Sequence, residues 1–455
     1  MRTPRRLPLE GHAGSRQRLT KAAVKGWIHT GTGTYTRRDM RILHTSDWHL
    51  GRHFGTQPLL EDQREFLRWL LEVVKEHRVE LVVVAGDVFD RAVPAAEAVE
   101  AWREALLRLR SLDARVVAIA GNHDGPARLA AYDGLTDLAG VWVRGGYARA
   151  GEILSIEGSD GPLAIVPLPF LDPLLAPTPA EDAPDAASIA LGAATGAAAA
   201  GATSPEPAPA DPPPAVARPT HESVLRTALE RAVSSIGGRR SVVLAHAWVS
   251  GGLASDSERA LTVGGAGQVE PSLFDGFSYV ALGHLHRPQS VGGRENLRYC
   301  GSPLSYSFSE EHDKQVLLLD LAPTGSVSIE PLAVPVGRKV ATLTGRLEEL
   351  LRAPEHEHAR GRWVRVRLTD TGIVLDAKTR LRERFPHVVE VALAATSPGR
   401  GEAPTDAHGA GGPAKSSHEL ALDFWSKVMG ESADPRVSEL LRSALEHARP
   451  GQEDA

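Results

Sequence analysis

Short apolar runs alternate with stretches of helical periodicity from Met40 onward. Three of these runs, 41–45, 80–85 and 114–120, are typical of buried strands. Between them, residues 59–77 and 95–109 place apolar side chains three and four positions apart, which indicates helices with one buried face. Further strands are expected at 163–167, 241–245, 279–282 and 316–321. This alternation predicts an α/β layered core in residues 40–335.

Two segments rich in Ala, Gly and Pro interrupt this pattern. Residues 176–219 are a low-complexity insertion, and residues 395–415 form a linker. Between them, residues 336–394 alternate strand and helix signals and predict a smaller α+β domain. Residues 416–448 predict a C-terminal helix pair, the second helix beginning with Asp434 as N-cap and Pro435 as its first residue. Such helices can dock on the parent domain or bind a partner helix.

Composition limits the class of protein. A length of 455 residues suggests more than one domain, and a net charge of -6 does not support a general nucleic-acid binder, although a local basic groove remains compatible with it. The single cysteine, Cys300, excludes an internal disulfide and a thiolate zinc site, and favours a reducing cytoplasm. No membrane span is predicted, because the run at 186–202 is Ala/Gly-rich. The basic residues 1–39 suggest a disordered tail or a start at Met40 rather than a targeting segment.

Five clusters of potential metal ligands each follow a predicted strand. They comprise Asp47 and His49; Asp87 and Asp90; Asn122, His123 and Asp124; His246; and His284 and His286. Taken singly, each cluster has an ordinary explanation, such as a surface histidine or a turn. Together they lie at the carboxyl ends of strands, where α/β sheets build their sites. The set therefore predicts a metal centre.

The ligand types indicate the chemistry. Carboxylate, amide and imidazole groups suit Mn, Fe or Zn rather than Ca or an iron–sulfur cluster. Asp87 is our candidate to bridge two cations, with one oxygen for each metal. Asp47 and Asp87 offset only two of four positive charges, so the site would attract phosphate. Two metals about 3.5–4 Å apart can activate a water for in-line attack on phosphorus. His123 suits proton donation to the leaving oxygen, and Asp124 is a candidate to orient its ring or to stabilise the charge on it.

The motifs D-x-H, G-D-x-x-D, G-N-H-D, H and G-H-x-H resemble those of calcineurin-like metallophosphoesterases, a resemblance that implies a two-sheet layered core. Flanking segments resemble the SbcD family more narrowly, the nuclease subunits of bacterial SbcCD complexes. These segments are Ile42–Gly51, Ala281–Gln289, Gly301–Leu304 and the tail around Phe424–Leu441. The resemblance runs from Met40 to about Leu445, apart from the 176–219 insertion.

The resemblance implies a residue assignment. One metal would take Asp47, His49, Asp87 and His286, and the other Asp87, Asn122, His246 and His284. His123 matches the catalytic histidine, and Asp90 would support a ligand rather than bind metal. The metals implied are two Mn²⁺ ions. The partners implied are DNA, placed by the smaller capping domain, and an SbcC-like SMC-type ATPase bound by the tail helices. The assembly implied is a homodimer within a heterotetramer.

The implied reaction is hydrolysis of DNA at double-strand ends, hairpins and single strands, in repair and recombination. Arg52, Arg91 and Arg128 follow metal motifs and are candidates for phosphate contacts, the alternative being solvated surface arginines. One competing function is hydrolysis of a small phosphodiester or a phosphoprotein, which gives the tail no role. The other is a non-catalytic scaffold for a coiled-coil partner, which leaves the complete ligand set unexplained.

Overall fold

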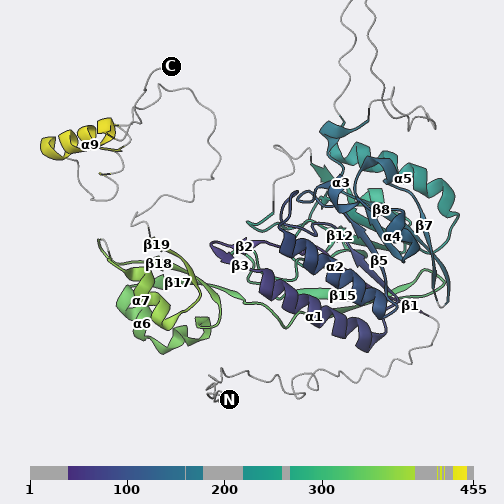
Figure 1. Cartoon of the computed structure of the whole chain (residues 1–455), viewed down its shortest axis with the longest axis horizontal. Helices are drawn as coiled ribbons and strands as arrows, with labels where there is room; N and C mark the ends of the chain where they lie inside the picture. Colours follow the sequence, from purple (N-terminus) through teal and green to yellow (C-terminus); the bar gives the residue numbers. More distant parts are fainter. Residues whose placement is uncertain are drawn as a thin grey trace, which may run out of the picture.

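The structure, a computed structural model, describes residues 39–158, 160–177, 219–258, 267–372, 374–394, 418, 421–422, 425 and 434–447. Two six-stranded sheets lie face to face, with helices on their outer faces (Figure 1). The prediction of a two-sheet α/β core is confirmed. The predictions for residues 1–38, for 178–218 of the insertion and for the linker at 395–415 fall outside the described residues.

The first sheet has the order β16-β15-β1-β4-β5-β6. Its strands are β16 (Val327–Ala333), β15 (Gln315–Leu321), β1 (Met40–Thr45), β4 (Leu81–Val84), β5 (Arg115–Ile119) and β6 (Val141–Arg144). Strands β1, β4, β5 and β6 are parallel, and β15 and β16 extend the sheet in antiparallel pairing. Helices α1 (Leu60–His77) and α2 (Ala96–Ser111) cover its outer face. The short helices α3 (Pro126–Leu129) and α4 (Leu135–Leu138) precede β6.

The second sheet has the order β13-β14-β12-β9-β8-β7. Its strands are β13 (Gln289–Val291), β14 (Arg294–Tyr299), β12 (Tyr279–Gly283), β9 (Ser241–His246), β8 (Gly161–Leu168) and β7 (Leu154–Gly158). The four central strands are parallel. Helix α5 (His221–Ile236) covers the outer face, and the short strands β10 (Trp248–Val249) and β11 (Gln268–Val269) pair beside it.

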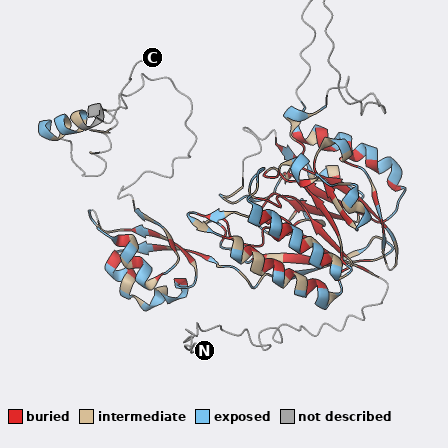
Figure 2. Ribbon diagram, viewed as in Figure 1, coloured by how far each residue is buried: buried red, intermediate tan, exposed pale blue. Residues whose placement is uncertain are grey.

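Alternation along the strands divides the core into three apolar layers (Figure 2). Ile42 and Val83 point between the two sheets, where they meet Ile165 and Leu244 of the second sheet. Their neighbour Leu43 points the other way, under the helices. Because both faces are buried, these strands are continuous apolar runs, which is why the sequence signals them clearly. The parallel strands of each sheet end at a common edge.

The smaller domain is a parallel three-stranded sheet with helices on one face. It comprises β17 (Val340–Gly345), α6 (Leu347–Arg352), β18 (Trp363–Leu368), α7 (Ala377–Arg384) and β19 (Val388–Leu393). It contacts the core near the hairpin of β2 (His53–Phe54) and β3 (Gln57–Pro58). There the ring of Phe54 stacks on Trp363 at 5.6 Å, which makes the contact between the two domains apolar.

Helix α9 (Pro435–His447) begins where the sequence predicts. Asp434 Oδ1 accepts from the backbone N–H groups of Arg436 and Val437, at 2.9 and 2.8 Å, as an N-cap does. Positions 418, 421–422 and 425 are helical, and the rest of the first predicted tail helix lies outside the described residues. No helix in the described ranges is both long enough and apolar enough to cross a membrane.

Candidate metal centre

The seven predicted ligands converge where the two sheets end side by side. Asp47 and His49 follow β1, Asp87 follows β4 and Asn122 follows β5, while His246 ends β9 and His284 and His286 follow β12. All except Asn122 are buried, with at most 2% of each residue exposed. Burying so many polar side chains costs free energy unless each one has a polar or charged partner. The distances between the side chains show which partners they have.

The first ligand set brings two imidazoles together. Nε2 of His49 lies 3.2 Å from Nε2 of His286, and a carboxylate oxygen of Asp47 lies within 4.8 Å of a ring nitrogen of each. Asp87 Oδ2 is 3.5 Å from His49 Nε2. These atoms surround one point.

The second ligand set surrounds a neighbouring point. Asn122 Oδ1 lies 2.9 Å from His246 Nε2 and 3.2 Å from His284 Nδ1. Asp87 Oδ2 is 3.6 Å from the same His246 Nε2, so this single oxygen faces a histidine of each set. Its Oδ1 instead accepts from the backbone N–H of His123 at 2.9 Å. A bridge through Asp87 would therefore use one oxygen, not one oxygen per metal as the sequence suggested.

The donor atoms fit divalent cations. His246 Nδ1 donates to the carbonyl oxygen of Ala85 at 2.9 Å, so Nε2 carries a lone pair. That lone pair faces Asn122 Oδ1, a second acceptor, at 2.9 Å, and His246 itself is fully buried. A cation satisfies both acceptors at once. Burial also lowers the pKa of His49 and His284 well below the ordinary value, which keeps these imidazoles neutral as metal ligation requires.

The backbone around the ligands is strained. Asp47, His49, Asp87 and His284 have φ of 54°, 43°, 49° and 105°, and they account for four of the seven such non-glycine residues in the described ranges. Each such conformation costs on the order of 1–3 kcal/mol. Hydrogen bonds hold it in place: Asp47 N–H donates to Gly86 O at 3.0 Å and His49 N–H to Asp87 O at 2.9 Å. These left-handed backbone conformations direct the four side chains into the site.

Two motif glycines allow the loops to approach each other. Gly86 has φ of 96°, and a Cβ there would lie 2.2 Å from Nδ1 of His246. A Cβ at Gly121 would lie 2.1 Å from Oδ1 of Asp87. Any side chain at either position would push a predicted ligand out of place.

Asp124 does not have the place that the sequence suggested. Its Oδ2 accepts from the backbone N–H groups of Val88 and Gly121, at 3.1 and 2.9 Å, and its Oδ1 accepts from Phe89 at 2.9 Å. Burial, and then the charge of Asp87, raise the pKa of Asp124 to about 7. Both oxygens are thus committed to backbone groups, and Asp124 joins the loops that follow β4 and β5 instead of orienting the ring of His123.

His123 is oriented by Asp90 instead. Nδ1 of His123 donates to the carbonyl oxygen of Asp90 at 2.9 Å, and the His123 ring lies edge-on to His49 with centroids 4.6 Å apart. The Asp90 carboxylate is 3.8 Å from Nδ1 of His49 and 3.3 Å from Arg52 Nη1. Asp90 therefore contacts two functional histidines, and its carboxylate lies within 4.8 Å of a ring nitrogen of each, so His49, Asp90 and His123 form a further group that could hold a metal ion. The supporting role expected for Asp90 stays a prediction.

The three candidate arginines lie in different environments. Arg52 is largely buried. Its Nη2 donates to the carbonyl oxygen of Ser257 at 3.3 Å, and its guanidinium lies 4.8 Å from the ring centre of Tyr306. Arg128 donates to the carbonyl oxygen of Ala92. The side chain of Arg91 is 75% exposed, 3.5 Å from Asp90. Arg91 and Arg128 are both exposed, and Arg91 also lies beside Asp90.

Sequence reasoning missed a buried support around Asp47 and His286. Tyr306 OH donates to the carbonyl oxygens of Asp47 and Trp48, at 3.1 and 2.7 Å, and Ser46 Oγ donates to Asp47 Oδ2 at 2.6 Å. Glu310, which is 1% exposed, faces Nδ1 of His286. The sequence does carry an acid and a base four residues apart, Glu310 and Lys314, but that spacing is more typical of a solvated surface pair.

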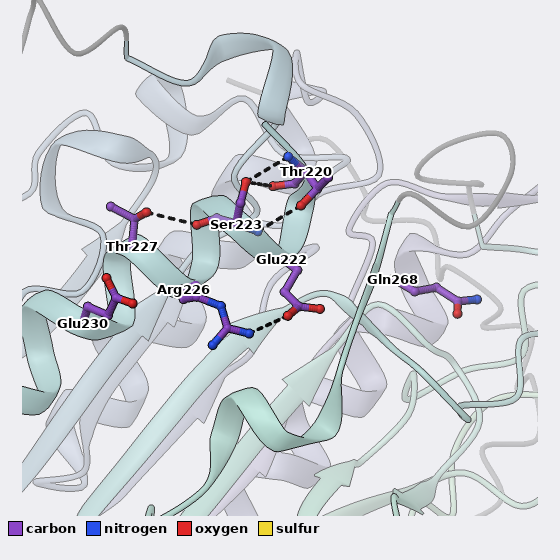
Figure 3. Close-up of a pocket in the computed structure, with 7 residues that line it drawn as sticks. All are labelled: Thr220, Glu222, Ser223, Arg226, Thr227, Glu230 and Gln268. Carbon is purple, nitrogen blue, oxygen red and sulfur yellow. Dashed lines mark hydrogen bonds and ion pairs between the residues drawn. The ribbon is translucent and has the colours of Figure 1, made fainter. Parts of the chain in front are cut away.

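A separate hollow lies at the start of α5 (Figure 3). Its walls include Thr220, Glu222, Ser223, Arg226 and Gln268. Thr220 and Ser223 cap the helix reciprocally and Glu222 pairs with Arg226, so these side chains satisfy one another. None of the predicted metal ligands lines this hollow.

Comparison with known proteins agrees with this geometry. Residues 40–166 match the calcineurin-like phosphoesterase family, and residues 336–425 match the family described as type 5 capsule protein repressor C-terminal domain. The chain is 31% identical to the SbcD subunit of nuclease SbcCD from Bacillus subtilis (strain 168) over 370 residues, 77% of this chain and 85% of the relative. The chain belongs to the SbcD family. The SbcD protein of Escherichia coli (strain K12) is 30% identical over 68% of this chain and 72% of its own length. The SbcD protein of Staphylococcus epidermidis is 27% identical over 77% of this chain and 84% of its own length.

Membership of the SbcD family settles the class of activity. The chain is a nuclease subunit and a hydrolase of phosphodiester bonds, and it depends on divalent metal, as its phosphoesterase domain implies. The predictions of a phosphodiesterase and of the SbcD family are therefore confirmed.

Proposed function

We propose that this chain hydrolyses DNA at a two-Mn²⁺ centre formed by the seven converging ligands. One observation carries the assignment: Asp87 Oδ2 faces His49 of one set and His246 of the other at 3.5 and 3.6 Å, as a bridging oxygen would. When bound, two such cations supply an activated water and neutralise charge on the phosphate. The carboxylate, amide and imidazole ligands suit Mn, Fe or Zn, the resemblance to the SbcD family favours Mn²⁺ among these, and the relatives are named as nucleases.

His123 is the proposed acid. The carbonyl oxygen of Asp90 fixes the proton on Nδ1, so Nε2 is the ring nitrogen that can exchange a proton with the substrate. The backbone N–H of His123 donates to Asp87 Oδ1. The position of the His123 ring therefore depends on the carboxylate that is proposed to bridge the two metals. Proton transfer from Nε2 would stabilise the leaving oxygen as the phosphodiester bond breaks.

The smaller domain is proposed to position DNA. Along β18, Val364, Val366 and Leu368 pack under the helices, so alternation places Arg365 and Arg367 on the opposite face. Arg365 contacts the ring of Phe308, which belongs to the core and packs on Phe54. Arg365 and Arg367, on a sheet face beside the nuclease core, suit contact with the phosphate backbone.

The proposed partners are an SbcC-like ATPase and a second copy of the chain. Leu440 of α9 is 63% exposed, as a helix that binds a coiled coil would require. Tyr132, Leu135 and Leu138, which lie within one short segment, are 70%, 69% and 88% exposed, and these exposed apolar side chains support a homodimer, within a heterotetramer that includes the ATPase. Deleting residues from Ser416 onward should abolish co-purification with the ATPase and spare metal binding. Persistent co-purification would refute the role of the tail.

The deciding assay is Mn²⁺-dependent cleavage of hairpin DNA, with and without the ATPase. His123→Ala should abolish cleavage while metal content and partner binding stay near those of the unmodified protein, because His123 is outside both ligand sets. Unchanged cleavage by this variant would contradict its role. An unmodified protein that, with its ATPase, cleaves small phosphodiesters and leaves DNA intact would favour the competing small-substrate function.

A further inference from the structure

A buried charged cluster lies behind His286, on the segment between β14 and β15. Its centre is Glu310, which has 1% of its surface exposed. Oε2 of Glu310 pairs with the ammonium of Lys314 and accepts from the backbone N–H of Tyr306 at 3.2 Å. Oε1 is directed elsewhere: it accepts from Ser257 Oγ and lies 3.3 Å from Nδ1 of His286.

The cluster holds His286 by its backbone as well as by its ring. His286 N–H donates to Glu258 Oε1 at 2.7 Å, and His286 O accepts from Lys314 Nζ at 3.4 Å. On the ring, Ser257 Oγ lies 2.7 Å from Nδ1, next to the Glu310 contact. Both oxygen partners of Nδ1 favour a hydrogen on that nitrogen, which leaves the lone pair on Nε2.

We infer that Glu310 is a positioning residue for the metal centre: it fixes the tautomer and direction of His286, so that Nε2 of His286 faces Nε2 of His49. This inference rests on the proposed two-metal site. A carboxylate that accepts from the far nitrogen of a ligating histidine orients the ring and makes it a better ligand. The sequence gives no hint of this contact, because 24 residues separate His286 from Glu310.

A purely structural ion pair would explain less. Lys314 could be satisfied by one oxygen of Glu310 together with Ser302 Oγ, which it contacts at 2.9 Å. The second oxygen need not then face His286. A buried ion pair is also a weak argument for a stabilising role, because apolar residues can often replace such a pair without loss of folding stability. The direction of Oε1 is therefore the feature that indicates a role at the ligand.

The test compares two isosteric substitutions, Glu310→Gln and Glu311→Gln. Glu311 is the exposed neighbour and serves as the matched control. Calorimetric titration of the metal-free protein with Mn²⁺ should show one binding step weakened about 10–100-fold in Glu310→Gln and neither step changed in Glu311→Gln. Cleavage by Glu310→Gln should recover when Mn²⁺ is raised, because the ligand itself remains.

A second variant separates positioning from folding. Glu310→Gln leaves the ammonium of Lys314 buried without its carboxylate, which could lower stability and weaken metal binding indirectly. Glu310→Gln/Lys314→Met removes that charge together with the Lys314 contact to His286 O, so it should regain thermal stability while Mn²⁺ affinity stays at or below that of Glu310→Gln. Recovery of full affinity in the double variant, or full affinity in Glu310→Gln, would overturn the inference. If the unmodified protein binds no Mn²⁺, the proposed metal centre itself fails.

Discussion

Replacing Asp124 with Ala distinguishes two roles that the sequence could not separate. A carboxylate that orients His123 would matter for the reaction and little for folding. A carboxylate that joins two loops would matter for folding first. The structure supports the second role, because Asp124 accepts three backbone N–H bonds, from Val88, Phe89 and Gly121.

The size of the effect follows from these bonds. A buried N–H without a partner costs about 1–3 kcal/mol, so three would cost about 3–9 kcal/mol. Water entering the space of the lost carboxylate relieves part of this. Removal of a group whose pKa is raised to about 7 also returns part of its burial cost. The expected net loss in free energy of unfolding for Asp124→Ala is therefore about 3 kcal/mol, near the lower limit of that range.

Urea denaturation at pH 7 with saturating Mn²⁺ measures this loss. Asp313→Ala is the control, because the Asp313 side chain is 77% exposed and should stay within about 0.5 kcal/mol of the unmodified protein. Metal content should also fall in Asp124→Ala, since the loops carrying Asp87 and Asn122 are no longer joined. An Asp124→Ala protein with unchanged stability and metal content but no cleavage would refute the loop-joining role.

Three further predictions follow from named contacts. His44 is fully buried and burial lowers its pKa to about 3, so below pH 6.5 the unfolded chain binds a proton that the folded chain does not. The contribution of His44 to the free energy of unfolding should therefore fall by about 2 kcal/mol from pH 7 to pH 5, and urea titrations of metal-free His44→Gln and unmodified protein should differ by that amount in their change with pH. Gly121→Ala should displace Asp87 and reduce bound Mn²⁺ by elemental analysis; full occupancy would contradict the close approach. Arg52→Ala should lower the melting temperature, whereas Arg91→Ala should only weaken DNA binding and reduce its salt dependence; equal melting temperatures would argue against the buried role of Arg52.

Sequence signals were strongest where both faces of an element are buried. Strands β1, β4 and β5 are continuous apolar runs, and strands and helices alternate in the smaller domain as its sequence signals predict. Helix α5 was missed, although Thr220 and Ser223 form a capping box and Val224, Leu225 and Ala228 follow at helical spacing. The Ala/Pro-rich insertion directly before this helix obscured these ordinary signals.

The sequence alone determined the kind of chemistry. It did so because each ligand follows the carboxyl end of a parallel strand, and strand order then brings those ends together whatever the loops do in detail. Residue type and strand position were enough to predict that Asp47, His246 and His286 lie at one edge of the sheets, before any distance was known.

Only the tertiary structure decided which atom of each side chain faces which neighbour. Asp124 accepts from backbone N–H groups, Asp90 orients the ring of His123, and Glu310 contacts His286 from another loop. A carboxylate can satisfy several partners equally well, and the choice depends on loop dihedral angles, including the left-handed ones at Asp47 and Asp87. Those angles are set by contacts between residues far apart in the chain, which no local pattern records.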